Sequence, residues 1–216
     1  MKSKKRLLAF LLAVVMLLAA CGGASNQSRE PIYRGKISGG IYTNNSIQLS
    51  FALPEGWRFE DCQGLAVFSH VDVEKFPGEG ADLRDFFDPI GRAPLIDMMA
   101  GVGSTTITVT IQDLSRTPGG ITALVEAHIE NIKRLMEMRY DQEHTILYIG
   151  EIAIGENAYY IVSMDVSMEI DSMQFEIELH RLFREQNGYA VIINFFTQSM
   201  PAETTITFDE IIAYFS

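Results

Sequence analysis

The sequence predicts an α+β domain in which a mainly antiparallel sheet packs against helices. Several segments alternate apolar and polar residues with a period of two, which is typical of strands that are buried on one face. Short turns between the later segments favour neighbouring antiparallel strands. Two further segments, 119–139 and 207–215, carry apolar residues at helical spacing. Together these patterns predict an α+β sandwich built around the sheet.

The first 21 residues resemble the export signal of bacterial lipoproteins. A basic run, KSKKR, precedes the apolar stretch LLAFLLAVVMLLAA, which is too short for a comfortable membrane span. The segment LAAC that ends at Cys21 resembles the lipobox, in which the cysteine thiol receives a diacylglyceryl group and the peptide is cut before it. This resemblance implies a protein anchored in the cell membrane through the lipid on Cys21 and facing the outside. The alternative is an ordinary secretory signal that ends near a cysteine.

The rest of the chain divides into a predicted tether and one globular domain. Residues 21–40 are small, polar and glycine-rich without a sustained period, which is typical of a flexible linker after a lipidated cysteine. Residues 41–216 have a globular composition and the length of a single domain. We expect residues 1–20 to be the removed signal peptide.

Charge and cysteine content exclude some classes of function. The chain has a formal net charge of −11, and removal of residues 1–20 lowers it by the four basic residues of that segment. Such a surface repels nucleic acid and anionic lipid, so no nucleic-acid partner is expected. If Cys21 is acylated, Cys62 has no partner for an intramolecular disulfide.

Alternation defines the strands along the chain. The segment 47–53 places Ile47, Leu49, Phe51 and Leu53 on one face, and 105–112 separates an apolar face from a threonine-rich one. The segments 158–170 and 174–179 alternate in the same way and are joined by a short turn. The strand YAVIINFF is apolar on both faces, which favours a central position in the sheet.

Two helices complete the predicted fold. In the segment 119–139 the apolar residues form one stripe, and His128 falls inside it. We expect His128 to form a hydrogen bond across the helix–sheet interface, and a ligand or catalytic base is the alternative. In the segment 207–215, Thr207 and Glu210 have the spacing of a capping box. The stripe of the first helix consists of Ile121, Leu124, Val125, Ile129, Ile132, Leu135 and Met136.

The order of these elements is similar to that of a known exported domain. The run GIYTN over 40–44, the strand and turn IQLSFALPEGW, the TITVTI strand, the long helix, the meander and the final helix ending YF carry the resemblance. They resemble Gram-positive bacterial lipoproteins with a PsbP-like α/β/α sandwich. That fold is shared by proteins of unrelated function, so the resemblance implies a fold and no activity. Trp57, after the Pro-Glu-Gly turn, is interpreted as a large ring that covers the end of the core rather than as the lip of a ligand site.

The predicted meander brings acidic side chains together. If residues 171 and 172 form a two-residue turn, Asp165 opposes Glu178 and Ser163 opposes His180. This face is predicted to hold an acidic patch, with His180 and Arg184 at its rim, and loose calcium binding there is one hypothesis. A solvated acidic surface is the alternative. The patch comprises Asp165, Glu169, Glu176 and Glu178.

The segment 62–95 departs from the pattern of the resemblance, and within it residues 76–95 are the least regular part of the predicted domain and hold a candidate interaction loop. The sequence leaves two interpretations of the Phe86–Phe87 pair open. The two rings form an exposed contact surface, or they pack into the core as a lid. The candidate residues are Asp82, Asp85, Phe86, Phe87 and Asp88.

No nucleophile elbow, phosphate loop or metal-binding cysteine pair is present in the sequence. We therefore expect a non-enzymatic, lipid-anchored accessory or binding protein without a metal or cofactor. Its partner would be an unknown protein, or a small apolar ligand held between sheet and helices. The alternatives are a hydrolase-like envelope enzyme whose residues meet only in space, and a weak cation-binding module.

Overall fold

The computed structural model describes residues 30–90, 94–115, 117–139, 145–170, 173–199 and 206–216. Residues 31–216 form one compact unit. The predicted signal peptide and the lipidation site Cys21 lie outside the described residues. No helix within the described ranges combines the length and apolar character needed to cross a membrane.

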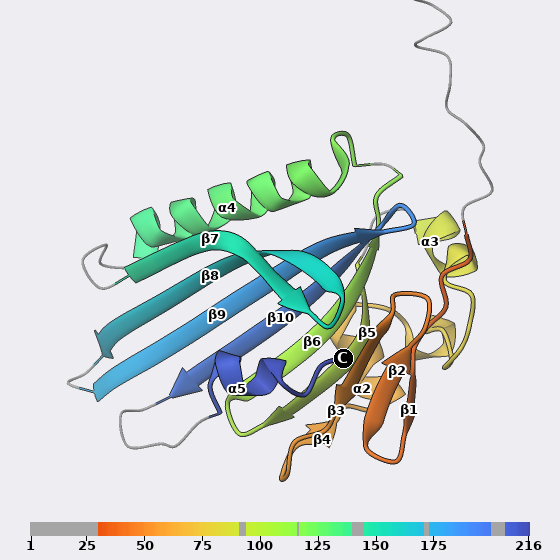
Figure 1. Cartoon of the computed structure of the whole chain (residues 1–216), viewed down its shortest axis with the longest axis horizontal. Coiled ribbons are helices and arrows are strands. Elements are labelled where there is room, and N and C mark those ends of the chain that lie inside the picture. Colours follow the sequence, from red (N-terminus) through yellow and green to blue (C-terminus); the bar gives the residue numbers. More distant parts are fainter. Residues whose placement is uncertain (1–29, 91–93, 116, 140–144, 171–172, 200–205) are drawn as a thin grey trace, which may run out of the picture. The chain divides into compact units, whose positions relative to one another are not determined.

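The larger sheet of the described chain has seven strands in the order β4-β5-β6-β10-β9-β8-β7, and the neighbouring strands are antiparallel (Figure 1). This arrangement confirms the predicted antiparallel sheet, and β10, the strand that is apolar on both faces, is central. The strands are β4 (Arg58–Phe59), β5 (Leu95–Val102), β6 (Thr105–Asp113), β7 (Thr145–Ile154), β8 (Asn157–Ile170), β9 (Met173–Gln186) and β10 (Tyr189–Ser199).

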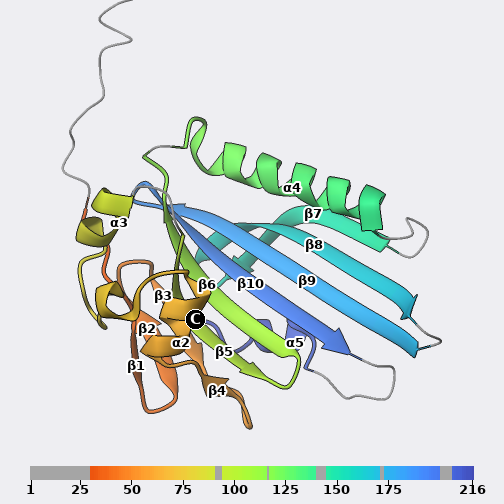
Figure 2. The same ribbon diagram turned by 180° about the vertical axis from the view of Figure 1, so that it is seen from behind.

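Other elements cover the two faces of this sheet (Figures 1 and 2). The long helix α4 packs on β8 and β9 from one side, and the short helix α2 packs on β5. A small antiparallel sheet, β1-β2-β3, and the helix α5 contribute to the core on the opposite side. The bounds are β1 (Lys36–Ser38), β2 (Ile41–Asn44), β3 (Leu49–Ala52), α2 (Cys62–Phe68), η1 (Val73–Lys75), α3 (Arg84–Ile90), α4 (Gly120–Arg139) and α5 (Phe208–Ile212).

The two helices follow the predicted patterns. Val125 and Ile132 of α4 are buried against the sheet, with Ile121, Leu124 and Ile129 packed beside them. The side chains of the last two predicted stripe residues lie outside the described part of α4. In α5 the predicted capping box is present, because the side chain of Thr207 accepts from the backbone of Glu210 and Glu210 bonds back to Thr207.

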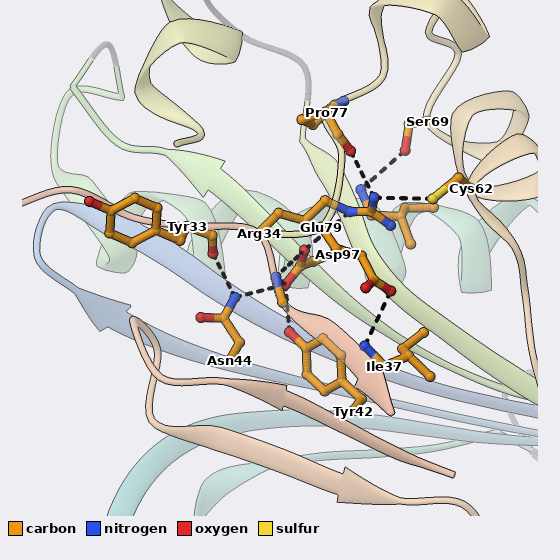
Figure 3. A network of polar contacts seen from close by, with 12 residues as sticks. Tyr33, Arg34, Ile37, Tyr42, Asn44, Cys62, Ser69, Pro77, Glu79 and Asp97 are labelled. Atoms are coloured by element: carbon orange, nitrogen blue, oxygen red, sulfur yellow. Dashed lines mark hydrogen bonds and ion pairs between the residues drawn. The ribbon is translucent and has the colours of Figure 1, made fainter. Parts of the chain in front are cut away.

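A buried ionic network joins the small sheet to β5 (Figure 3). A bulge at Asp97 turns its carboxylate inward, where it accepts hydrogen bonds from the Gly35 amide at 3.0 Å, Tyr42 Oη at 2.5 Å and Asn44 Nδ2 at 2.8 Å. The Arg34 Nε atom lies 3.7 Å from the same carboxylate, and both side chains are almost fully buried. Burial raises the pKa of Asp97, and these hydrogen bonds oppose that shift.

This network corrects the predicted start of the domain. The sequence predicts that the flexible tether extends to residue 40, yet Ile32 and Arg34 are buried and β1 begins at Lys36. The prediction is wrong because the composition of this segment is that of a linker. Periodicity also cannot reveal that Arg34 is buried beside Asp97, a carboxylate far away in the sequence. Cys62, the free cysteine of the described residues, is exposed, and its sulfur lies 3.3 Å from the Arg34 guanidinium.

The irregular segment 62–95 forms the short elements α2, η1 and α3. Phe86 and Phe87 of α3 are 8% and 3% exposed and belong to the core. The packing alternative therefore holds for these two rings, which are not available as a contact surface. Trp57, after the turn at Gly56 with its φ of +81°, is also part of this core, as interpreted from the sequence.

Candidate functional site

A pocket of about 540 Å³ lies on the α4 side of the sheet. It arises because α4 packs on β8 and β9 while the seven-residue helix α2 packs on β5. The sheet surface between them, contributed by β6 and β10, is left without a covering helix. Residues at the end of α2 form one wall, and residues of α4 form the other.

The lining combines apolar side chains with a continuous polar chain. Apolar contacts come from α2, the sheet and α4, through Phe68, Ile96, Leu124, Phe183 and Ile192. Such mixed lining with a few convergent polar groups is typical of small-molecule sites, and the volume lies within the usual range. The remaining lining residues are Ser69, His70, Pro94, Thr108, Thr110, Gln112, Ala127, His128, Asn131, Arg181 and Asn194.

The polar chain crosses three strands and reaches the helix. The Arg181 Nε atom of β9 donates to the side-chain oxygen of Asn194 on β10, and Asn194 Nδ2 donates to Thr108 Oγ1 on β6 at 2.8 Å. The Arg181 guanidinium also lies 3.0 Å from His128 Nδ1 on α4. These bonds fix the position of Arg181 in the lining of the pocket.

His128 accepts the hydrogen bond from Arg181 because it is held neutral. Burial, with a further contribution from the adjacent Arg181 cation, lowers the pKa of His128 from 6.5 to about 4. Its Nδ1 lone pair therefore accepts from the guanidinium at neutral pH, and the proton resides on Nε2. The predicted hydrogen bond of His128 across the helix–sheet interface is confirmed.

Arg181 has no carboxylate partner among the described residues, and its neighbours His128 and Asn194 are both neutral. Burial lowers the pKa of Arg181, but a guanidinium stays charged under all ordinary conditions. A partly buried cation that lacks a counter-charge carries an uncompensated desolvation cost. An anionic group placed in the pocket would offset that cost. Basic side chains are outnumbered by acidic ones on this chain, which has a formal net charge of −11.

Sequence reasoning missed the pocket, although one signal points to it. Arg181 shares the phase of Leu179 and Phe183, and Asn194 shares the phase of Ala190 and Ile192. Each is a polar residue at a position where the strand pattern predicts an apolar one. Polar residues in an apolar phase that meet across neighbouring strands indicate a lined cavity rather than a dry core.

The predicted acidic patch is brought together in part. The predicted register is confirmed, because Asp165 pairs with Glu178 and Ser163 with His180 across β8 and β9. Glu176 is exposed, and the side chain of Glu169 lies outside the described residues. The carboxylates of Asp165 and Glu178 converge on His180.

The expected positions at the rim of this patch are corrected. His180 and Arg184 are each only 8% exposed. Arg184 donates to the carbonyl oxygen of Ile47, in the connection between β2 and β3, and lies over the Tyr159 ring, and these contacts remove it from the surface. Strand alternation predicts the face of a residue but not which element covers that face.

The acidic residues of the candidate interaction loop do not converge on a site within the described residues. Asp82 forms an ion pair with Arg84 at 2.5 Å, which holds the pKa of Asp82 below its ordinary value. Asp85 is exposed, and the side chain of Asp88 lies outside the described part of α3.

These features define an α+β protein whose seven-stranded antiparallel sheet is flanked on both faces, with a pocket between α2 and α4. No family model matches the chain, and no curated protein matches it, so the PsbP-like resemblance stays a prediction.

Several solved structures are similar in part. LpqN, involved in cell envelope biogenesis of Mycobacterium tuberculosis, has 11% identity and a TM-score of 0.41, with 87% of this chain and 89% of LpqN covered. A Bacteroides thetaiotaomicron protein has 10% identity and a TM-score of 0.36 over 83% of this chain, which spans 48% of that protein. PA94 of Pseudomonas aeruginosa, a putative regulator, has 17% identity and a TM-score of 0.26 over 47% of this chain and 65% of PA94. These likenesses are too distant to carry a functional argument.

Proposed function

We propose that this protein is a non-enzymatic binding protein that holds a small amphiphilic ligand in the pocket between α2 and α4. The ligand has an apolar body and an anionic head group, such as a carboxylate or phosphate. The observation that carries this proposal is the Arg181 cation, which lines a mixed apolar pocket without a carboxylate partner among the described residues.

The geometry supports an orientation for the ligand. The head group would take charge-assisted hydrogen bonds from Arg181, while Phe183 and Ile192 beside it contact the apolar body. The polar chain through Asn194 and Thr108 keeps the guanidinium in place before binding, which reduces the entropy cost of association. A hydrogen bond to a charged group contributes about 1.5–3 kcal/mol.

A binding role is favoured over catalysis by the composition of the lining. The described lining places neither a carboxylate nor a cysteine beside His128, and its pKa of about 4 makes it a weak base at neutral pH. The pocket therefore offers recognition groups rather than a nucleophile with an adjacent base.

We also propose that the protein acts at the outer face of the cell membrane, anchored through lipid on Cys21. The basic, apolar and small-residue segments before Cys21 support this location. The Cys21→Ala form should appear in the culture medium, whereas continued membrane retention of that form would contradict anchoring through this residue.

The pocket is tested by binding of dansylaminoundecanoic acid, a fluorescent carboxylate with an apolar chain. Ala127 lines the pocket and is exposed on α4, so Ala127→Trp should block the site without disturbing the core. Thr122→Trp is the matched control, because Thr122 is exposed on the same helix outside the pocket lining.

We expect fluorescence enhancement with wild-type protein and with Thr122→Trp, and an affinity at least about 10-fold lower with Ala127→Trp, which corresponds to about 1.4 kcal/mol. Equal binding by the two tryptophan variants would place the probe elsewhere and contradict the proposal.

A further inference from the structure

A second cluster lies on the sheet face opposite the pocket. Because successive residues of a strand point to opposite faces, His180 faces away from the pocket that Arg181 lines. Cross-strand pairing brings Asp165 of β8 opposite Glu178 of β9, and Ser163 opposite His180. One ligand atom from each of Asp165, Glu178 and His180 lies within 4.8 Å of the others.

We propose that Asp165, Glu178 and His180 bind a divalent metal ion of the zinc class. The proposal is independent of the ligand pocket and uses no residue of its lining.

The buried imidazole of His180 is positioned to act as a metal ligand. His180 is 8% exposed, its ring stacks on Phe208 of α5 with centroids 4.1 Å apart, and its Nδ1 atom lies 2.7 Å from Ser163 Oγ. With the Nδ1 proton donated to Ser163, the Nε2 lone pair points toward the carboxylates. A ligand histidine is commonly held in this way, with its second nitrogen bonded to a neighbouring group.

The Nε2 atom of His180 has no hydrogen-bond partner among the described residues, although it is fully buried. The Oδ1 atom of Asp165 is likewise buried and has no hydrogen-bond partner among the described residues. Glu178 Oε1 lies 3.3 Å and Asp165 Oδ1 4.0 Å from Nε2, without hydrogen-bond geometry between them. A bound cation would satisfy both orphaned atoms at once.

The distances suit a small transition-metal ion. Zinc ligands lie at about 2.0–2.2 Å from the metal, so two ligand atoms of a tetrahedral site are about 3.3–3.6 Å apart. The Glu178 distance has this value, and the half-exposed side chain of Asp165 can move the remaining few tenths of an ångström. Two carboxylates and a neutral imidazole also match the charge of a divalent cation.

The donor set favours zinc over calcium. Calcium takes six to eight oxygen ligands, whereas imidazole nitrogen is typical of zinc and other transition metals. The three protein ligands leave a coordination position for water or an added ligand. The proposed site uses two of the four residues of the predicted acidic patch, and its donor set differs from the one that calcium prefers.

The test is isothermal titration with Zn²⁺ in a Cys62→Ser background, which removes an exposed thiol that could compete for zinc. We expect one zinc per chain, and at least about 10-fold weaker binding for Asp165→Asn, Glu178→Gln and Ser163→Ala, since a neighbour that orients a ligand typically contributes 10–100-fold in metal affinity. Glu176→Gln is the matched control, because Glu176 is exposed two residues from Glu178 on the same face. Its affinity should stay within about twofold of the parent.

Co²⁺ substitution provides a second measurement that does not depend on folding of the variants. Wild-type protein with Co²⁺ should show the visible absorption of a four- or five-coordinate cobalt site. In a separate NMR titration of wild-type protein, the imidazole nitrogen resonances of His180 should shift on addition of Zn²⁺ but not of Ca²⁺. Zinc binding that is absent, or equally strong in Glu178→Gln and Glu176→Gln, would overturn the proposal.

Discussion

The two faces of the seven-stranded sheet differ in how a buried or partly buried arginine is compensated. On the face covered by β1-β2-β3, Arg34 is buried beside Asp97, whose carboxylate collects further hydrogen bonds. On the α4 face, Arg181 is partly buried beside neutral partners only, within the described residues. The first cation has a buried carboxylate beside it, whereas the second has no carboxylate partner among the described residues.

Under the proposed function, this difference separates a structural site from a ligand site. In a buried charge pair such as Arg34 and Asp97, removal of one partner is strongly destabilising, because the other charge is left buried without compensation. A cation that lacks a counter-charge at the wall of a pocket is a candidate recognition element, because a bound anion would offset its desolvation cost.

The largest expected effect falls on the packed face. Asp97→Ala should lower the free energy of unfolding by roughly 3–5 kcal/mol, because Arg34 is left without a counter-charge and three donors lose their acceptor. Urea denaturation followed by circular dichroism measures this loss. Asp72→Ala is the control, because Asp72 and Lys75 form an exposed ion pair that should contribute less than about 1 kcal/mol. A loss of similar size in both variants would contradict the structural role of the network.

A smaller, pH-dependent effect is expected on the pocket face. The pKa of His128 in the folded protein is about 4, below its ordinary value of 6.5. Above pH 6.5 the imidazole is neutral in both folded and unfolded states, so it has no effect on stability. As the pH falls from 6.5 to 4, the unfolded chain binds the proton preferentially, and the folded state loses about 1–2 kcal/mol after allowance for solvent screening.

Comparison with His128→Gln isolates this titration, because glutamine can still accept from Arg181 and carries no proton in this range. Thermal melting at pH 7 and pH 4.5 should show a larger decrease for wild-type protein than for the variant. Parallel decreases in both proteins would show that His128 is solvated and not held neutral by burial.

The same comparison shows what the sequence can predict. Alternation placed Ile107, Val109 and Ile111 on the packed face and predicted the register of β8 and β9, because one face of each strand must be buried. The capping box of α5 was visible because it depends on residues three apart. Such local patterns are sufficient for most of the fold.

The candidate sites depend on contacts between distant residues. Arg34 and Asp97 are 63 positions apart in the printed numbering, and Arg181 meets His128 through the packing of α4 on the sheet. The sequence around one residue of each pair does not indicate which distant residue it contacts. The sequence does show which polar residues occupy strand positions where the alternation predicts apolar ones. Such positions are the best starting points in a search for a candidate site.

The pocket is tested most directly by comparing a carboxylate with its uncharged analogue in two proteins. Dansylaminoundecanoic acid and its primary amide have the same apolar body, so the ratio of their affinities reports the head-group interaction alone. Arg181→Met removes the cation and keeps an apolar stem, and Arg58→Met, at the exposed position of β4, is the matched control. We predict that wild-type protein and Arg58→Met bind the acid at least about 10-fold more tightly than the amide, and that Arg181→Met binds both equally. Equal affinities in wild-type protein, or an unchanged preference in Arg181→Met, would contradict an anion-binding role for this pocket.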